Sequence, residues 1–207
     1  MLRQDPEFFR YVMFSDEATF HNIGQLNRHN CHYWSVENPH WFRDHQQHWS
    51  LIMWCGIVNG YLIGPYFFEG NVNSARYLHF LRHELPDLLA NVDLQTRQRM
   101  WFQQDGAPAH KSRIVQRFLH RRYPRRWIGI SSHVEWCPRS PDLTSLDFFL
   151  WGFLKNMIYT DAPTTRESMV QRITDACRNI PRHVLLSNVQ NFERRIQLCI
   201  MGAFSKI

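Results

Sequence analysis

The sequence predicts an α/β protein in which a mixed β-sheet is covered by helices on both faces. Of its 207 residues, 44% are hydrophobic and 14% aromatic, which is enough to form one sizeable core and excludes a disordered chain. Strand-like segments come first, helices and strands then alternate, and helices follow to the end, as in a sheet packed between two helical layers. No apolar run approaches the roughly 18 residues that a membrane span needs, so no membrane partner is expected.

The N-terminal part is expected to supply most of the sheet. Strands are predicted at residues 10–21, 26–34, 49–59 and 61–68. The first places Asp16 in the middle of an alternating apolar segment. The last two are joined by Asn59-Gly60, a pair typical of a tight type I′ hairpin.

The remainder is expected to alternate between helices and short strands. Leucines three and four residues apart predict an amphipathic helix over 71–91, with Ser74 as its N-cap and Pro86 as a point where it could kink. Short strands are predicted at 100–104 and 127–130, and helices at 111–122, 146–159, 166–179 and 183–200.

One segment carries the whole excess of positive charge. The chain has a net charge of +6, and residues 106–134 contain seven cationic side chains and no acidic one. They are Lys111, Arg113, Arg117, Arg121, Arg122, Arg125 and Arg126. A solvated helix face is the simple interpretation. Nucleic-acid contact is favoured because no carboxylate within the segment neutralises the arginines, whose planar groups suit phosphate oxygens.

Three carboxylates lie in apolar surroundings, where an unpaired negative charge costs several kcal/mol. Asp16 is inside a predicted strand, Asp105 follows another, and Asp147 begins an apolar helix. If the three converge, their oxygens would form a site for Mg²⁺ or Mn²⁺.

Each of these acids also has a structural interpretation. Asp147 could belong to a capping box opened by Thr144. Asp105 could start the turn before Gly106. Asp16 could pair with an arginine across the sheet, and the spacing of the three acids alone does not prove that they converge.

Several short motifs follow one another along the chain. They are Phe14-Ser-Asp-Glu-Ala-Thr-Phe-His, Asn27-Arg-His-Asn, Tyr33-Trp, Glu37-Asn-Pro-His, Trp54-Cys-Gly-Ile, Gly64-Pro-Tyr-Phe-Phe, Gln103-Gln-Asp-Gly-Ala-Pro-Ala-His and Pro138-Arg-Ser-Pro-Asp-Leu-Thr-Ser-Leu-Asp-Phe-Phe-Leu-Trp-Gly. Together, over about residues 10–180, this ordered set resembles the catalytic domain of mariner-superfamily DDE/D transposases.

The resemblance implies an RNase H-like fold, with a five-stranded mixed sheet in a single catalytic domain over residues 1–207. It also implies that Asp16, Asp105 and Asp147 meet at one edge of the sheet as a triad binding Mg²⁺ or Mn²⁺. The implied activity is that of a DNA endonuclease and strand transferase acting on transposon ends and target DNA. The family's N-terminal helix-turn-helix DNA-binding region is expected to be absent from this chain.

The resemblance leads to a two-metal hypothesis for the reaction. Asp16 would bridge both ions, while Asp105 and Asp147 would each complete one coordination sphere. His110 could touch the scissile phosphate or close the turn at Gly106, and the second is favoured. Asp142 is expected to cap or orient the loop before Asp147. By strand alternation, Glu17 points away from Asp16 and is expected to be structural.

Two other functions stay open from the sequence. A domesticated or decayed transposase fragment could bind nucleic acid through the basic segment without cutting it. Alternatively, the C-terminal helices could form a homodimer face through Phe192, Ile196, Leu198 and Ile200. Five scattered cysteines without a C-x-x-C motif indicate a reducing compartment, so a nuclear or cytosolic location, with the nucleus favoured, is expected.

Overall fold

The sheet has five strands in the order β3-β2-β1-β4-β5. The structure, a computed structural model, describes residues 5, 7–22, 49–136, 143–160 and 165–200. The strands are β1 (Val12–His21), β2 (Ser50–Val58), β3 (Tyr61–Phe68), β4 (Trp101–Gln103) and β5 (Trp127–Ile128). Pairing is antiparallel in β1–β2 and β2–β3 and parallel in β1–β4 and β4–β5, which confirms the predicted mixed sheet. The predicted strand at 26–34 and Asp142 lie outside the described residues.

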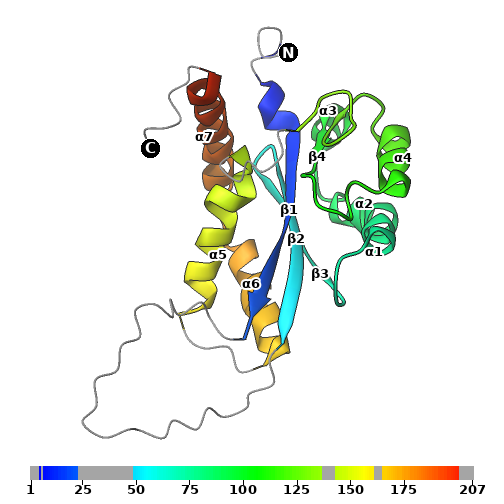
Figure 1. The fold of residues 1–207 in the computed structure, drawn as a ribbon. Helices are drawn as coiled ribbons and strands as arrows, with labels where there is room; N and C mark the ends of the chain where they lie inside the picture. The colour runs from blue at the N-terminus through cyan, green and yellow to red at the C-terminus, as the bar shows by residue number, and fades with distance from the viewer. Residues whose placement is uncertain (1–4, 6, 23–48, 137–142, 161–164, 201–207) are drawn as a thin grey trace, which may run out of the picture.

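Helices cover both faces of the sheet, as predicted (Figure 1). On one side lie α1 (Ser74–His79), the π-helical turn η3 (Phe80–Glu84), α2 (Leu85–Leu88), α3 (Leu94–Arg99) and α4 (Arg113–Arg122). On the other side lie the π-helical turn η5 (Leu146–Leu150), α5 (Trp151–Ile158), α6 (Arg166–Arg178) and α7 (Arg182–Ile200). A short 3₁₀ turn, η1 (Phe8–Tyr11), precedes β1. No helix in the described part of the chain is long and apolar enough to cross a membrane.

Strand β1 divides the core into two clusters because its side chains alternate between the faces. Val12 and Phe14 pack in the cluster formed with α5, α6 and α7. Met13 packs in the other cluster, with residues of α1 and α4. Neighbouring residues of this strand therefore belong to different sides of the molecule.

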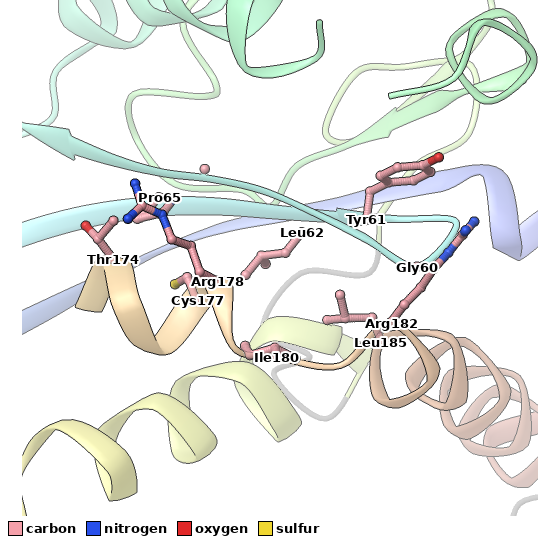
Figure 2. A pocket seen from close by; sticks show the side chains of 11 residues that line it. Gly60, Tyr61, Leu62, Pro65, Thr174, Cys177, Arg178, Ile180, Arg182 and Leu185 are labelled. Carbon is pink, nitrogen blue, oxygen red and sulfur yellow. The ribbon is translucent and has the colours of Figure 1, made fainter. Parts of the chain in front are cut away.

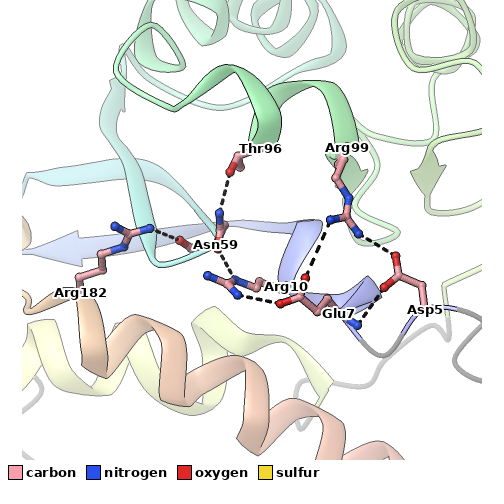
Figure 3. A network of polar contacts seen from close by, with 7 residues as sticks. All are labelled: Asp5, Glu7, Arg10, Asn59, Thr96, Arg99 and Arg182. Atoms are coloured by element: carbon pink, nitrogen blue, oxygen red, sulfur yellow. Dashed lines mark hydrogen bonds and ion pairs between the residues drawn. The ribbon is translucent and has the colours of Figure 1, made fainter.

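The β2–β3 hairpin turns at Asn59-Gly60, as the sequence predicts. Both residues have positive φ angles, 47° and 74°, which a type I′ turn requires. Buried Asn59 donates from Nδ2 to Thr96 Oγ1 at 2.6 Å and accepts from Arg10 Nε at Oδ1. Figure 3 shows how this side chain ties the hairpin to η1 and α3, with Arg182 of α7 reaching the Asn59 carbonyl.

The predicted helix at 71–91 is present but differs in two details. Its N-cap is Asn73, not Ser74, because Asn73 Oδ1 accepts from the backbone N–H groups of Ala75 at 3.1 Å and Arg76 at 3.0 Å. The second difference is that the helix is divided, with the π-helical turn η3 between α1 and α2, and Pro86 is the second residue of α2. The sequence interpretation missed α3, although Asp93 caps it by accepting from Thr96 N at 2.8 Å.

Candidate active site

Asp16 projects from the middle of β1 towards α5. Trp151 Nε1 donates a hydrogen bond to Asp16 Oδ2 at 2.8 Å. Burial raises the pKa of Asp16 to about 7, and the charges of Asp147 and Glu17 act in the same direction against the Trp151 hydrogen bond. Asp16 has no arginine partner among the described residues, so the structure does not support the cross-sheet pair considered from the sequence.

Asp105 lies just beyond β4, the parallel neighbour of β1. The last pair of this ladder is Phe14 with Gln103. Asp16 on β1 and Asp105 in the loop after β4 each follow this pair by two residues, so both lie beyond the same end of the ladder. Ala107 N donates to Asp105 Oδ1 at 3.0 Å, which forms the turn proposed as this residue's structural alternative. Burial opposes the charged form, but the hydrogen bond and charge of His110 hold the pKa of Asp105 below its usual value.

Asp147 lies in the first turn of η5, one turn before Trp151. Burial raises its pKa, the negative charge of Asp105 adds to the effect, and a hydrogen bond from the Thr144 side chain and the charge of Lys155 oppose it. The contact with Thr144 agrees with part of the capping alternative, but the N-cap position is Ser145, whose side chain makes no capping bond.

The fold thus brings the three acids into one electrostatic environment from three distant segments. Asp147 acts on Asp16, and Asp105 acts on Asp147. Among the described residues, however, no group of three or more His, Cys, Asp or Glu side chains already has the geometry to hold a metal ion. The arrangement is a concentration of negative charge rather than a preformed coordination shell.

A second polar cluster adjoins Asp105 on the other side of the sheet. His110 is 3% exposed, and its Nδ1 lies 2.6 Å from Asp105 Oδ1 while its Nε2 lies 3.4 Å from Glu17 Oε1. Burial disfavours the imidazolium, but the Glu17 charge and the contacts with both carboxylates raise the pKa of His110 to about 10. Its ring also packs on Tyr77 with 4.2 Å between centroids.

The sequence led to one expectation for His110 and one for Glu17. His110 closes the turn, because its backbone N–H bonds to Ala107 O at 3.0 Å and its ring contacts Asp105. Glu17 does point away from Asp16, but there it meets His110, a contact the sequence interpretation missed. Strand alternation predicts on which face of the sheet Glu17 lies. No local pattern in the sequence indicates that His110, 93 positions later, packs against Glu17.

The basic segment forms α4 and the turn after it. Lys111, Arg113, Arg117, Arg121, Arg122 and Arg125 are exposed, whereas Arg126 is half-buried and donates to the Gln98 carbonyl. Val115 and Leu119 bury the opposite side of the helix. Exposed Arg82 of η3, which the sequence interpretation did not single out, lies 5.7 Å from the Phe118 ring centroid and extends the positive surface.

A pocket of about 450 Å³ lies elsewhere, between strand β3 and the α6–α7 corner (Figure 2). Its lining includes Gly60, Tyr61, Cys177, Arg178 and Arg182, and none of the three acids. Asp16 and Asp147 therefore do not share this cavity.

Comparison with known proteins shows similarity to transposases. The chain is 29% identical over 191 residues to the "Transposable element Tc3 transposase" of Caenorhabditis elegans. The alignment covers 89% of this chain and 54% of the Tc3 protein, so the chain spans about half the length of that relative. No protein-family model matches the sequence.

Solved structures of Mos1 transposase have the same fold. A "Mos1 transposase paired-end complex with left transposon end" matches with a TM-score of 0.72 at 18% identity, covering 98% of this chain and 57% of that chain. The "Mos1 transposase catalytic domain and Raltegravir with Mg" matches with a TM-score of 0.70 at 17% identity, covering 98% and 87%. The chain is therefore similar in sequence to Tc3 transposase and has the RNase H-like fold of the Mos1 transposase catalytic domain.

Proposed function

We propose that this chain is the catalytic part of a divalent-metal-dependent DNA endonuclease and strand transferase of the transposase type. The observation that carries the proposal is that Asp16, Asp105 and Asp147 share one electrostatic environment, with Asp16 and Asp105 each two residues beyond the last pair of the β1–β4 ladder. The relationship to Tc3 transposase and the Mos1 fold support the same class of activity.

The donor set fits Mg²⁺ or Mn²⁺. Both ions prefer carboxylate oxygens, and the Mos1 catalytic domain has been solved with Mg. Burial raises the pKa values of Asp16 and Asp147, and this supports the proposal because a bound dication would favour their ionised forms. Ligation by all three acids would need their side chains to rotate towards a common centre, since the described residues form no ready cluster.

Two of the three acids are already partly oriented by the protein. Trp151 holds Asp16 through Oδ2, and Ala107 with His110 holds Asp105 through Oδ1. In the proposed reaction Asp16, Asp105 and Asp147 would together hold the divalent ions. The bound ions would supply activation of a water or 3′-hydroxyl nucleophile and neutralisation of the negative charge on the leaving oxygen.

We propose that α4 contacts the DNA backbone. Replacing Arg113, Arg117 and Arg121 together by glutamine is expected to weaken binding to any duplex sequence and to reduce the slope of log K against log salt by up to about 3, because each phosphate contact contributes about 0.9 to that slope. Fluorescence anisotropy at several salt concentrations measures both. The matched control replaces exposed Arg166 and Arg178 of α6, on the opposite face, and should leave the slope unchanged. Equal slopes for both variants would refute contact through α4.

The proposed activity is tested by nicking of supercoiled plasmid. Nicked product is expected with Mg²⁺ or Mn²⁺ and none with a chelator, because without a bound cation the three carboxylates would repel the phosphate and could not neutralise the leaving oxygen. Returning Mn²⁺ after chelation should restore the activity, which distinguishes metal loss from unfolding. Salt-sensitive DNA binding without metal-dependent cleavage would instead support the alternative, a nucleic-acid-binding protein derived from a transposase.

A further inference from the structure

Asp105 lies outside the sheet, in the loop that follows β4. It follows Gln103, the last paired residue of β4, by two positions, and its side chain is 42% exposed. Two contacts orient its carboxylate, Ala107 N at 3.0 Å and His110 Nδ1 at 2.6 Å, and both end on Oδ1. Neither contact involves Oδ2, so, as far as the described part of the chain shows, this oxygen is the one available to bind a metal ion.

His110 can orient Asp105 only if its own ring is held. The ring is almost fully buried and packs against Tyr77 on one side. Its second nitrogen, Nε2, lies 3.4 Å from Glu17 Oε1. Apart from this ion pair, neither of these two buried atoms has a hydrogen-bond partner among the described residues. Glu17 and His110 therefore depend on each other.

Glu17 joins this chain of contacts to the central strand. It directly follows Asp16 on β1, but its side chain lies on the opposite face. Strand β1 thus carries Asp16 itself and, through Glu17 and His110, the support for Asp105. Carboxylates that bind metals are commonly fixed in this way by hydrogen bonds to groups behind them.

We propose that Glu17 is a positioning residue, which acts through His110 to hold Asp105 with Oδ2 turned towards the metal. This inference rests on the proposed function, because it requires that Asp105 binds a divalent ion. Glu17 itself touches neither metal nor DNA in this role.

The test is Mn²⁺ affinity, measured by calorimetry on the full chain without DNA. Glu17→Ala is expected to weaken Mn²⁺ binding about 10- to 100-fold, the usual loss when such a support is removed. Glu17→Gln should stay within about 3-fold of the unmodified protein, since its amide can still pair with Nε2. In a protein that already carries His110→Ala, Glu17→Ala should weaken Mn²⁺ binding further by less than about 2-fold, because Glu17 acts through the His110 ring.

Several outcomes would overturn the role of Glu17. Equal losses for Glu17→Gln and Glu17→Ala would indicate a simple effect of charge near the metal. Additive losses in the double variant would show that Glu17 does not act through His110. A lowered melting temperature with unchanged Mn²⁺ affinity would leave it only structural. Glu167→Ala on exposed α6 is the matched control. If the unmodified protein binds no Mn²⁺, the proposed function itself fails, a result distinct from these three.

Discussion

Asp16→Asn is expected to make the metal-free protein more stable above pH 7, although it should abolish metal-dependent DNA cleavage. Burial raises the folded-state pKa of Asp16 from 3.8 to about 7, so the folded chain binds this proton more tightly than the unfolded chain does. The resulting stability is fully present below pH 4 and is lost as pH rises through 7. Above that pH the ionised group costs on the order of 2–4 kcal/mol, at about 1.4 kcal/mol per pKa unit.

Urea unfolding at pH 5 and pH 8, with a chelator present, measures this effect. Asparagine is neutral and of similar shape, and it can still accept from Trp151 Nε1. The gain in unfolding free energy should therefore be larger at pH 8 than at pH 5. Added Mn²⁺ should stabilise the unmodified protein and not the variant. The exposed Asp87→Asn is the control. If Asp16→Asn were less stable than the unmodified protein at pH 8, the idea that Asp16 carries an uncompensated negative charge would be wrong.

Asp105→Asn is expected to reduce plasmid nicking at least about 10³-fold with the fold retained. Asparagine keeps an oxygen that can accept from Ala107 N and His110 Nδ1, so the turn after β4 should survive. The amide nitrogen would replace the free oxygen Oδ2, and hard divalent ions bind oxygen donors in preference to amide nitrogen. The expected loss is therefore chemical rather than structural.

Plasmid nicking in Mn²⁺ and thermal unfolding, measured on the same preparation, distinguish loss of a metal ligand from loss of the fold. The melting temperature should change little while the nicking rate falls. Asp175→Asn, a matched change on the surface of α6, should leave both unchanged. Nicking by Asp105→Asn at the rate of the unmodified protein would exclude Asp105 as a metal ligand.

The sequence predicts the sheet well because its signals are local. Alternation identifies β1, and Asn59-Gly60 identifies the hairpin, where both residues adopt the required positive φ angles. The apolar surroundings of Asp16 are equally visible in the sequence, and in the structure this residue is half-buried, which raises its pKa. These features depend on near neighbours, which a linear pattern records.

Other features depend on contacts between distant segments. The pairing of Glu17 with His110 needs the loop after β4 to fold back against β1, and no periodicity encodes that contact. The short helix α3 was missed because six residues give too little amphipathic pattern, although its Asp93 cap was visible. The choice of Asn73 over Ser74 as N-cap depends on one residue's backbone conformation, because both types are good caps.

The position of Asp16 and Glu17 as neighbours on β1 makes this strand intolerant of insertions and deletions. Gaining or losing one residue before Asp16 would reverse the face of each later side chain relative to β2 and β4. The acid that faces Trp151 and the acid that faces His110 would then exchange sides. Changes in length should therefore accumulate in the connections between strands, whereas β1 keeps its ten residues.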